Sequence, residues 1–368
     1  MENIQHRLTF FKTLLETYKI ESVSKQLEEL KTKSSDETLF LAVIGEFNSG
    51  KSTSINALLG RRILKEAVLP TTACATYIVR GRGEIEIGAV VGNESFHVTE
   101  SHPERLNAYI NKHYGIKISN IQHLIDTLTS EQSVARNVKA LMLSIPDINL
   151  PDNIVIIDTP GFNPGEQSVD NHFEVTKEVV EKHADAALVL MPSDQPFSNS
   201  LRTFLQNYLH KYIHRCLFVV TKCDQKTKEE RGMIYNFVCN RLKADFKLLG
   251  AKVFCESAIT TLPVKKIPES MKEEWSYWQS EFSKFKKEIW QRLEKQRKII
   301  LSEHLYNLML DLSAEMHNRL NEKQEELRKQ KEKIDRSRVE HIETITKESS
   351  RRAKQNIALL VNKAKEVL

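Results

Sequence analysis

The sequence lacks any long hydrophobic stretch. No run of about 18 apolar residues occurs in its 368 residues, so we expect no membrane-spanning helix. The first twelve residues mix polar and charged side chains with apolar ones, which does not fit a secretory signal peptide. The five cysteines form no C-x-x-C pair and no metal-ligand spacing, so we expect free thiols and no structural metal. These absences together indicate a cytoplasmic protein.

A large excess of charge is also missing. The 54 Lys and Arg residues against 49 Asp and Glu residues give a net charge of +5, which does not suggest a dedicated nucleic-acid binder. From Leu327 to Leu368 the count is twelve Lys and Arg against six Asp and Glu. That local basic excess is compatible with RNA or with anionic lipid, although a plain solvated helix face is the simpler interpretation.

Glycine and proline are absent from Glu269 onward, where charged residues are dense. Apolar residues between Ile289 and Leu320 recur mainly at spacings of three and four, which predicts a long amphipathic helix. We expect a break in it near Met271–Ser283. No capping residue ends the pattern at Leu368, so we expect the helix to continue in a longer protein.

One stretch, Gly45-Glu-Phe-Asn-Ser-Gly-Lys-Ser-Thr53, has the G-x-x-x-x-G-K-S pattern of a phosphate-binding loop. The apolar run Leu39–Ile44 before it predicts a buried strand, and Ile55–Leu59 after it predicts the start of a helix. In that context backbone N–H groups and the helix dipole would bind phosphate. Lys51 would supply a point charge for the β- and γ-phosphates, and the Ser52 hydroxyl would bind Mg²⁺.

Two further stretches would place ligands near that loop. Asn153–Ile157 predicts an apolar strand, and the carboxylate of the following Asp158 can hold the water shell of Mg²⁺. The Gly161 N–H, three residues later, would meet the γ-phosphate. Thr72, or in second place Thr71, lies in a loop that can close over the metal.

A third stretch, Thr221-Lys-Cys-Asp224, follows another apolar strand and would select the base. The Asp224 carboxylate can accept hydrogen bonds from N1–H and the 2-amino group of guanine, whereas adenine offers neither donor. The Lys222 stem can lie along the base plane. After the next strand, Ser257-Ala258 can offer a backbone N–H to guanine O6. An ordinary turn without function is the competing interpretation of both stretches.

Together these stretches predict one guanine-nucleotide site that uses Mg²⁺. The predicted nucleotide-binding residues are Gly45, Glu46, Phe47, Asn48, Ser49, Gly50, Lys51, Ser52, Thr53, Asp158, Gly161, Thr221, Lys222, Asp224, Ser257 and Ala258. The predicted metal ligands are Ser52, Thr72 and Asp158, and Lys51 and Thr72 are predicted to be catalytic.

Strands alternate with helices through the middle of the chain, which predicts an α/β fold with a mixed, mainly parallel sheet. Residues 76–98 predict a three-strand antiparallel meander, because glycine-containing turns separate β-branched runs. Residues 100–138 predict helices, and helical periodicity over 1–33 predicts an N-terminal helix. The expected domains are an N-terminal helix over 1–35, a nucleotide-binding domain over 36–265 and a helical segment over 266–368.

The motifs GEFNSGKST (45–53), LPTTA (69–73), DTPG (158–161) and TKCD (221–224) together resemble those of the dynamin-like large GTPases, in particular bacterial dynamin-like proteins and mitofusins. The resemblance covers residues 1–300. It implies a P-loop GTPase domain whose flanking helices pack as a helical neck or bundle. It also implies hydrolysis of GTP to GDP, stimulated when two such domains dimerise across their nucleotide faces.

The resemblance further implies a partner and a setting. The partner would be a second copy of the chain or a related GTPase, and the function would be remodelling, tethering or fusion of membranes through peripheral contact with an anionic surface. No apolar paddle or transmembrane hairpin occurs in the C-terminal segment, so membrane insertion by this chain is not supported.

Two positions of the site bear on how water would be activated. Small GTPases often have a water-orienting glutamine after D-x-x-G, but this chain has Phe162 there. Water would then be positioned by backbone, by a switch threonine or by the dimer partner. In related GTPases that dimerisation activates, a polar residue of the phosphate loop binds a monovalent cation. Asn48 matches that position, which implies a catalytic role with K⁺ or another monovalent cation, unless Asn48 is only a turn former.

Two alternatives remain open. An Era-like RNA- or ribosome-associated GTPase would place its basic C-terminal helix on RNA. The N-terminal helix, the insertion over 100–138 and the lack of a compact β-containing C-terminal module argue against it. A nucleotide-gated scaffold with negligible turnover is the second alternative, and Phe162 permits it.

Overall fold

The computed structural model describes residue 27 and residues 37–66, 74–161, 172–263, 267 and 269–367. Contacts divide the chain into two compact units, residues 37–304 and residues 1–36 with 305–368. The unit that holds the sheet reaches His304, beyond the boundary expected after residue 265. It does so because the first part of α10 (Lys272–Val367) contributes Phe282, Phe285 and Ile289 to the core of the sheet.

The described strands form one mixed sheet in the order β4-β3-β5-β2-β6-β1-β7-β8-β9. The strands are β1 (Leu39–Ile44), β2 (Thr76–Arg80), β3 (Glu86–Val91), β4 (Glu94–Thr99), β5 (Val138–Ile145), β6 (Ile154–Asp158), β7 (Ala186–Pro192), β8 (Cys216–Thr221) and β9 (Val253–Cys255). From β6 to β9 every neighbouring pair is parallel. The prediction of an α/β fold with a mainly parallel sheet is confirmed.

The antiparallel meander expected over 76–98 is wrong, because β5 lies between β2 and β3. β2 pairs with β5 and β6, and only β3 and β4 form the expected hairpin. The apolar residues of β5 explain the change: Leu141 and Leu143 join the same buried cluster as Ile78 of β2 and Ile87 of β3. The turn residues determine where each strand ends, whereas the burial of apolar side chains determines which strands lie next to each other.

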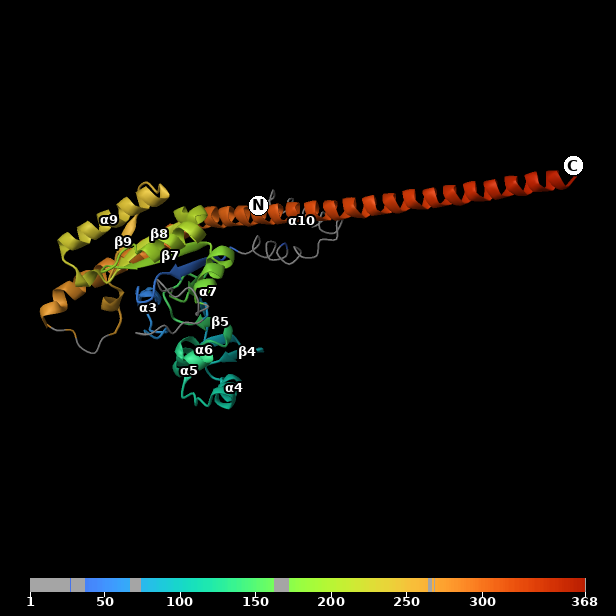
Figure 1. Ribbon diagram of the computed structural model, residues 1–368. Helices are drawn as coiled ribbons and strands as arrows, with labels where there is room; N and C mark the ends of the chain where they lie inside the picture. The colour runs from blue at the N-terminus through green and yellow to red at the C-terminus, as the bar shows by residue number, and fades with distance from the viewer. Residues whose placement is uncertain are drawn as a thin grey trace. The chain divides into compact units, whose positions relative to one another are not determined.

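The described helices of the sheet unit are α3 (Lys51–Leu59), α4 (Glu104–Tyr114), α5 (Ile121–Ser130), α6 (Gln132–Ala135), α7 (His172–Glu178), α8 (Asn199–Phe204), α9 (Lys228–Phe246) and the first part of α10. Figure 1 shows α4, α5 and α6 gathered beside β4 and β5, and α9 at the other end of the sheet beside β9. The expected helices of the 100–138 insertion are therefore present, and they extend the edge that lies away from α9.

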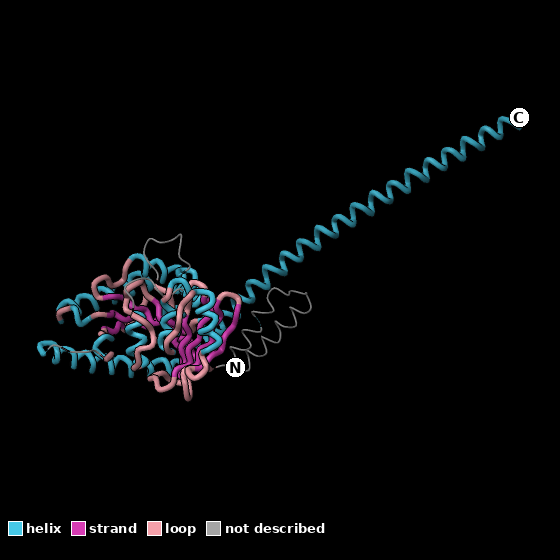
Figure 2. Tube along the Cα trace, turned by 90° about the horizontal axis from the view of Figure 1, so that it is seen from below, coloured by secondary structure: helices cyan, strands magenta, loops and turns pink. Residues whose placement is uncertain are grey.

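The sheet is buried on both faces. In β1, Leu39, Leu41 and Val43 join one apolar cluster and Ala42 and Ile44 join the other, as expected when side chains alternate along a strand. Residues of α3 and the first part of α10 complete the first cluster, and residues of α8 and α9 complete the second. Figure 2 shows the strands side by side with helices around them. Helices on both faces leave the strand ends as the place for polar chemistry.

A buried polar contact joins α10 to the amino ends of β1 and β7. The Asp185 Oδ2 atom accepts a hydrogen bond from the Phe40 N–H at 2.8 Å, and Oδ1 contacts His304 Nδ1. Both side chains are buried. A buried carboxylate is tolerated when it is paired in this way, so the contact fixes α10 at the last residue of this unit.

The break expected near Met271–Ser283 is also wrong. A short 3₁₀ turn at Glu269–Met271 leads directly into α10, which continues without interruption from Lys272. Trp278, Phe282 and Phe285 are buried at spacings of four and three, which keeps one face of this segment on the core.

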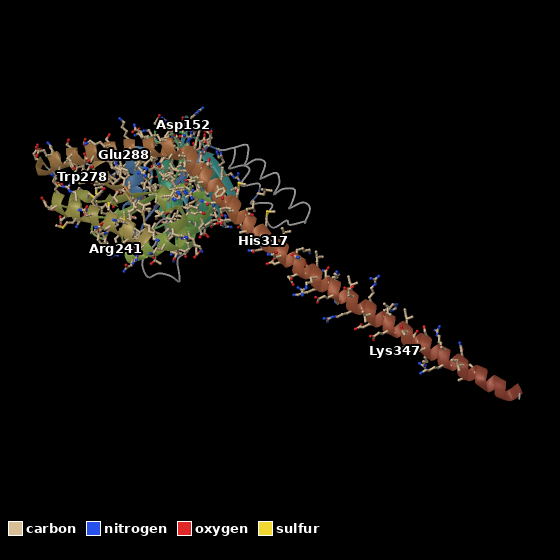
Figure 3. All side chains as sticks on the ribbon, turned by 90° about the horizontal axis from the view of Figure 1, so that it is seen from above. Asp152, Arg241, Trp278, Glu288, His317 and Lys347 are labelled. Carbon is tan, nitrogen blue, oxygen red and sulfur yellow. The ribbon has the colours of Figure 1, made fainter. Side chains whose placement is uncertain are left out.

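In the other unit, the described residues are Leu27 and α10 from Leu305 onward. Leu27 is helical and buried, and the rest of the helix expected over 1–33 lies outside the described residues. Leu305, Met309, Leu312 and Met316 are buried at helical spacing, whereas the described side chains beyond residue 320 are exposed. Figure 3 shows the side chains around Lys347 standing away from the helix. No described helix has a stretch long and apolar enough to cross a membrane.

Candidate nucleotide-binding site

The predicted phosphate loop connects β1 to α3 at the carboxyl ends of the parallel strands. Asn48 and Gly50 have φ values of 61° and 86°, so both are in the left-handed region. Gly50 caps α3 without a side-chain hydrogen bond, and no acidic residue lies in the first turn of the helix. The first N–H groups of α3 therefore have no side-chain acceptor at the cap, which suits an anion.

Close approaches require glycine at two positions, Gly45 in this loop and Gly161 after β6. A Cβ atom on Gly45 would lie 2.5 Å from Ser49 Oγ and 2.6 Å from the Leu190 carbonyl oxygen. A Cβ atom on Gly161 would lie 2.8 Å from Lys51 Nζ and 2.9 Å from the Phe47 Cα atom. The structure thus brings the stretch after β6 against the phosphate loop, as the sequence predicted for a site formed at the strand ends.

Lys51 is buried and points back into its own loop. Its Nζ atom donates to the carbonyl oxygens of Gly45 at 3.0 Å and Glu46 at 2.9 Å. Burial lowers the pKa of Lys51 to about 8, although the nearby carboxyls of Asp158 and Glu46 act in the opposite direction. The ammonium is thus stabilised by dipoles and neighbouring carboxyls, and an anionic phosphate would stabilise it further.

Asp158 ends β6 and is 2% exposed. Burial raises the pKa of its carboxyl to about 7, and Lys51 only partly offsets that effect. Its Oδ1 atom has no hydrogen-bond partner among the described residues. A buried oxygen of this kind is stabilised by a hydrated divalent cation, and hydroxyl and carboxylate oxygens are ligands that Mg²⁺ accepts. Ser52, in the first turn of α3, and Asp158 therefore fit a magnesium site.

Some predicted residues cannot be placed. Thr72, Thr71 and Phe162 lie outside the described residues, so their proposed parts in metal binding and water activation stay predictions. Asn48 is described and exposed at the outer side of the loop. Its left-handed backbone is what a turn former adopts, and its exposed amide is equally able to meet a cation or a partner.

The stretch after β8 is tied to the phosphate loop. Thr221 Oγ1 donates to the Ser49 carbonyl oxygen at 2.8 Å, and Lys222 adopts the left-handed φ of 59°. The Ser193 hydroxyl donates to the Lys222 carbonyl oxygen at 2.9 Å and holds this turn. Asp224 follows in a 3₁₀ turn, and its Oδ1 atom is buried without a partner among the described residues. That oxygen is free to accept a hydrogen bond from a ligand.

Ser257 and Ala258 follow β9, the strand beside β8. Ser257 is 1% exposed, and its hydroxyl has no partner among the described residues. The Cys223 N–H donates to the carbonyl oxygen of Glu256 at 3.1 Å, which joins this turn to the one that carries Asp224. The structure therefore brings the two predicted base-recognition stretches together.

The structure also shows three contacts that sequence reasoning missed. The Glu46 side chain accepts hydrogen bonds from Ser198, the cap of α8, and from Ser200 in its first turn, so it connects the phosphate loop to that helix. The Ser54 hydroxyl donates to Glu256 Oε1 at 2.8 Å, and both side chains are buried. The sequence offered two signals for the contact between Ser54 and Glu256. Ser54 lies among the apolar residues of α3, and Glu256 directly follows an apolar strand.

These features define a P-loop nucleotide-binding fold: a glycine loop between a buried strand and a helix, with the other polar stretches at neighbouring strand ends. Comparisons with known proteins narrow the class. Residues 41–223 match the model of the Dynamin family, and the chain belongs to the dynamin-like large GTPases. The resemblance noted in the sequence is confirmed.

Three relatives illustrate the match. A protein described as uncharacterised, from Caldicellulosiruptor sp. (strain Rt8B.4), is 28% identical over 67% of this chain and 55% of its own length. The probable transmembrane GTPase FZO-like, chloroplastic, of Arabidopsis thaliana is 29% identical over 51% of this chain and 16% of its own length. Dynamin-like protein 2 of Campylobacter jejuni is 24% identical over 59% and 31%.

A solved structure of an oligomerised bacterial dynamin pair shares the fold. Its TM-score is 0.50 at 20% identity, and the alignment covers 97% of this chain and 53% of that one. This chain thus spans about half, or less, of the length of the relatives and the structure that it matches.

The raised pKa of Asp158 predicts how stability depends on pH. In the native protein the carboxyl binds a proton up to about pH 7, whereas an unfolded carboxyl loses it near pH 4. The native state therefore loses stability as pH rises from 4 to 7. We expect Asp158→Asn to stabilise the nucleotide-free protein by about 1–3 kcal/mol more at pH 7.5 than at pH 5.

Chemical unfolding at the two pH values, without Mg²⁺, measures this difference. Asp152→Asn is the matched control, because the Asp152 carboxyl is exposed and its ion pair with Arg80 is a surface one. Equal effects of both substitutions at both pH values would show that Asp158 is not an uncompensated buried acid.

Proposed function

We propose that this chain binds GTP with Mg²⁺ and hydrolyses it to GDP and phosphate. One observation carries the proposal: the buried Lys51 ammonium lies at the start of α3 within the loop of Gly45 and Glu46, and an oxygen of its neighbour Asp158 has no partner in the described part of the chain. Such a site can bind a polyphosphate and a divalent cation. The Lys51 ammonium and the Asp158 carboxyl would each gain a partner of opposite charge, which a buried charge needs to be stable.

Each part of this site has a role in the proposed reaction. The N–H groups at the start of α3 and the Lys51 ammonium would bind the β- and γ-phosphates and stabilise charge that develops on them. Ser52 and Asp158 would hold Mg²⁺, which neutralises phosphate charge when bound. Gly161 lies so close to Lys51 that its N–H can approach the same phosphate.

Guanine selectivity is proposed to reside in Asp224. The buried Oδ1 atom lacks a partner among the described residues, so a ligand that donates a hydrogen bond would relieve the cost of its desolvation. Guanine offers two donors on one edge, and adenine would leave the carboxylate without a partner. The connection from Thr221 to Ser49 then sets the distance between base and phosphates.

We propose that two nucleotide faces meet, in a homodimer or with a related GTPase, and that the contact positions the attacking water, with Asn48 placed to bind K⁺ or a similar cation. The exposed Asn48 supports this role. Coupling to a membrane is supported by relatives: one is named a transmembrane GTPase, and the solved dynamin pair is described as sensing and tethering membranes.

Lys51→Ala is expected to lower the turnover number for GTP at least about 100-fold, because it removes the only cation buried within the loop of the described site. Release of phosphate under steady-state conditions measures it. Lys139→Ala serves as the control, since that exposed lysine donates to Asn93 on the surface of the sheet. Unchanged turnover in Lys51→Ala would exclude the proposed mechanism.

Asp224→Asn is expected to change the base that the site prefers from guanine to xanthine. The amide would weaken GDP binding about 100-fold, because it cannot accept both guanine donors, and would strengthen binding of xanthosine diphosphate. Xanthine has a carbonyl oxygen where guanine has the 2-amino group, and the amide N–H₂ can donate to it. Calorimetric titration with both nucleotides measures the exchange. Native protein that binds ADP as tightly as GDP would remove the assignment.

Turnover per molecule is expected to rise with protein concentration if two nucleotide faces form the active species. A rise of at least about fivefold between dilute and saturating protein is the expected scale for such coupling. Phosphate release should be measured in K⁺ and in Na⁺ buffers, with ultracentrifugation in GDP and in a non-hydrolysable GTP analogue. Turnover that is independent of concentration would favour hydrolysis by single molecules or a nucleotide-gated scaffold.

A further inference from the structure

Glu256 is a buried acid to which the proposed reaction assigns no part. It directly follows β9 and is 1% exposed. Its Oε1 atom accepts a hydrogen bond from the Ser54 hydroxyl at 2.8 Å. Its main chain is bonded as well: its N–H donates to the Val220 carbonyl oxygen at 2.9 Å, and its carbonyl oxygen accepts from the Cys223 N–H at 3.1 Å.

These three bonds connect the turn after β9 to α3, to β8 and to the turn that carries Asp224. Ser54 lies on α3 one turn after Lys51, so it moves with the helix that begins the phosphate loop. Cys223 directly precedes Asp224, and Ala258 carries the N–H expected to meet guanine O6. The bond from the Glu256 carboxyl to Ser54 therefore connects both base-recognition turns to α3.

The electrostatic setting explains why an acid can occupy this corner. Burial raises the pKa of Glu256 to about 8, and Asp224 and Cys255 act in the same direction, while the hydrogen bond from Ser54 acts against it. At neutral pH the carboxyl is therefore mostly uncharged, so it does not repel Asp224. An uncharged carboxyl carries one O–H group, so the second oxygen of Glu256 can donate a hydrogen bond as well as accept one.

Three buried polar atoms of this corner have no partner among the described residues: Asp224 Oδ1, Glu256 Oε2 and Ser257 Oγ. Unpaired buried polar atoms are costly, and few occur in native proteins. Three from two adjacent turns indicate a polar pocket that a ligand or water completes. Glu256 is the one of the three that also bonds to α3.

We propose that Glu256 is a positioning residue for base recognition, which fixes the turn that carries Asp224 and the turn at Ser257–Ala258 relative to α3. The inference rests on the proposed guanine-nucleotide site, which it deepens. A purely structural role would weaken all nucleotides alike. A positioning role predicts a specific loss of the discrimination that the Asp224 carboxylate provides.

The test compares GDP with inosine diphosphate, which has the same phosphates, ribose and O6 but lacks the 2-amino group. Titrations at pH 7 with Mg²⁺ should use native protein, Glu256→Ala, Glu256→Gln and Ser54→Ala, with Glu100→Ala as an exposed control. We expect Glu256→Ala to weaken GDP about tenfold or more and to reduce the ratio of GDP to inosine diphosphate affinity. Glu256→Gln should keep most of the GDP affinity and most of the affinity ratio, because its amide oxygen still accepts a hydrogen bond from Ser54.

Ser54→Ala provides a milder variant if Glu256→Ala does not fold. It should reduce the same ratio by a smaller factor, and combining the two substitutions should add little to Glu256→Ala alone, since both break one bond. An unchanged ratio in both single variants, or an equal loss of affinity for both nucleotides, overturns the inference. Native protein that shows no preference for GDP over ADP overturns the proposed function instead, so the two failures are distinguishable.

Discussion

The buried ammonium of Lys51 is the constraint on which the nucleotide site depends. A cation of this kind is stable away from water only if dipoles and charges surround it, and here two carbonyl oxygens of its own loop accept its hydrogen bonds. The loop then turns through left-handed residues at Asn48 and Gly50. Because Gly50 caps α3 without a side-chain hydrogen bond, the first N–H groups of the helix have no side-chain acceptor at the cap. One loop thus supplies both the acceptors for the buried cation and the uncapped helix start.

The sheet supplies the remaining groups through its order. Because β6, β1, β7, β8 and β9 are parallel neighbours, the chain leaves each of these strands at the same edge of the sheet. Asp158, Thr221 and Glu256 lie at or directly after the ends of three such strands. Polar side chains are tolerated at this edge because the helices bury the two faces of the sheet and not its strand ends. The antiparallel hairpin of β3 and β4 and the helices after it extend the opposite side of the sheet.

Much of this arrangement could be predicted from the sequence, because it depends on local signals. An apolar run followed by a polar motif marks a strand end, and four such marks located the phosphate loop, Asp158, Asp224 and the turn at Ser257. Pairing across long separations could not be predicted in this way. The insertion of β5 beside β2 depends on which apolar strand fits the exposed edge, and turn residues near Gly81 and Gly92 carry no information about that choice. The Ser54–Glu256 bond, across 202 residues, was missed for the same reason.

The base and phosphate ends of the site are connected through the interior of the protein as well as through the ligand. Thr221 bonds to the carbonyl of Ser49 in the phosphate loop, and Glu256 bonds to Ser54 on the helix that follows it. Both connections start from the stretches proposed to recognise guanine and end on the segment that carries Lys51. In the proposed site, a base bound by Asp224 would therefore act on the same turns that bond to the phosphate loop and to α3. Base selectivity and phosphate positioning would then be coupled, because these two hydrogen bonds join the two ends of the site within the protein.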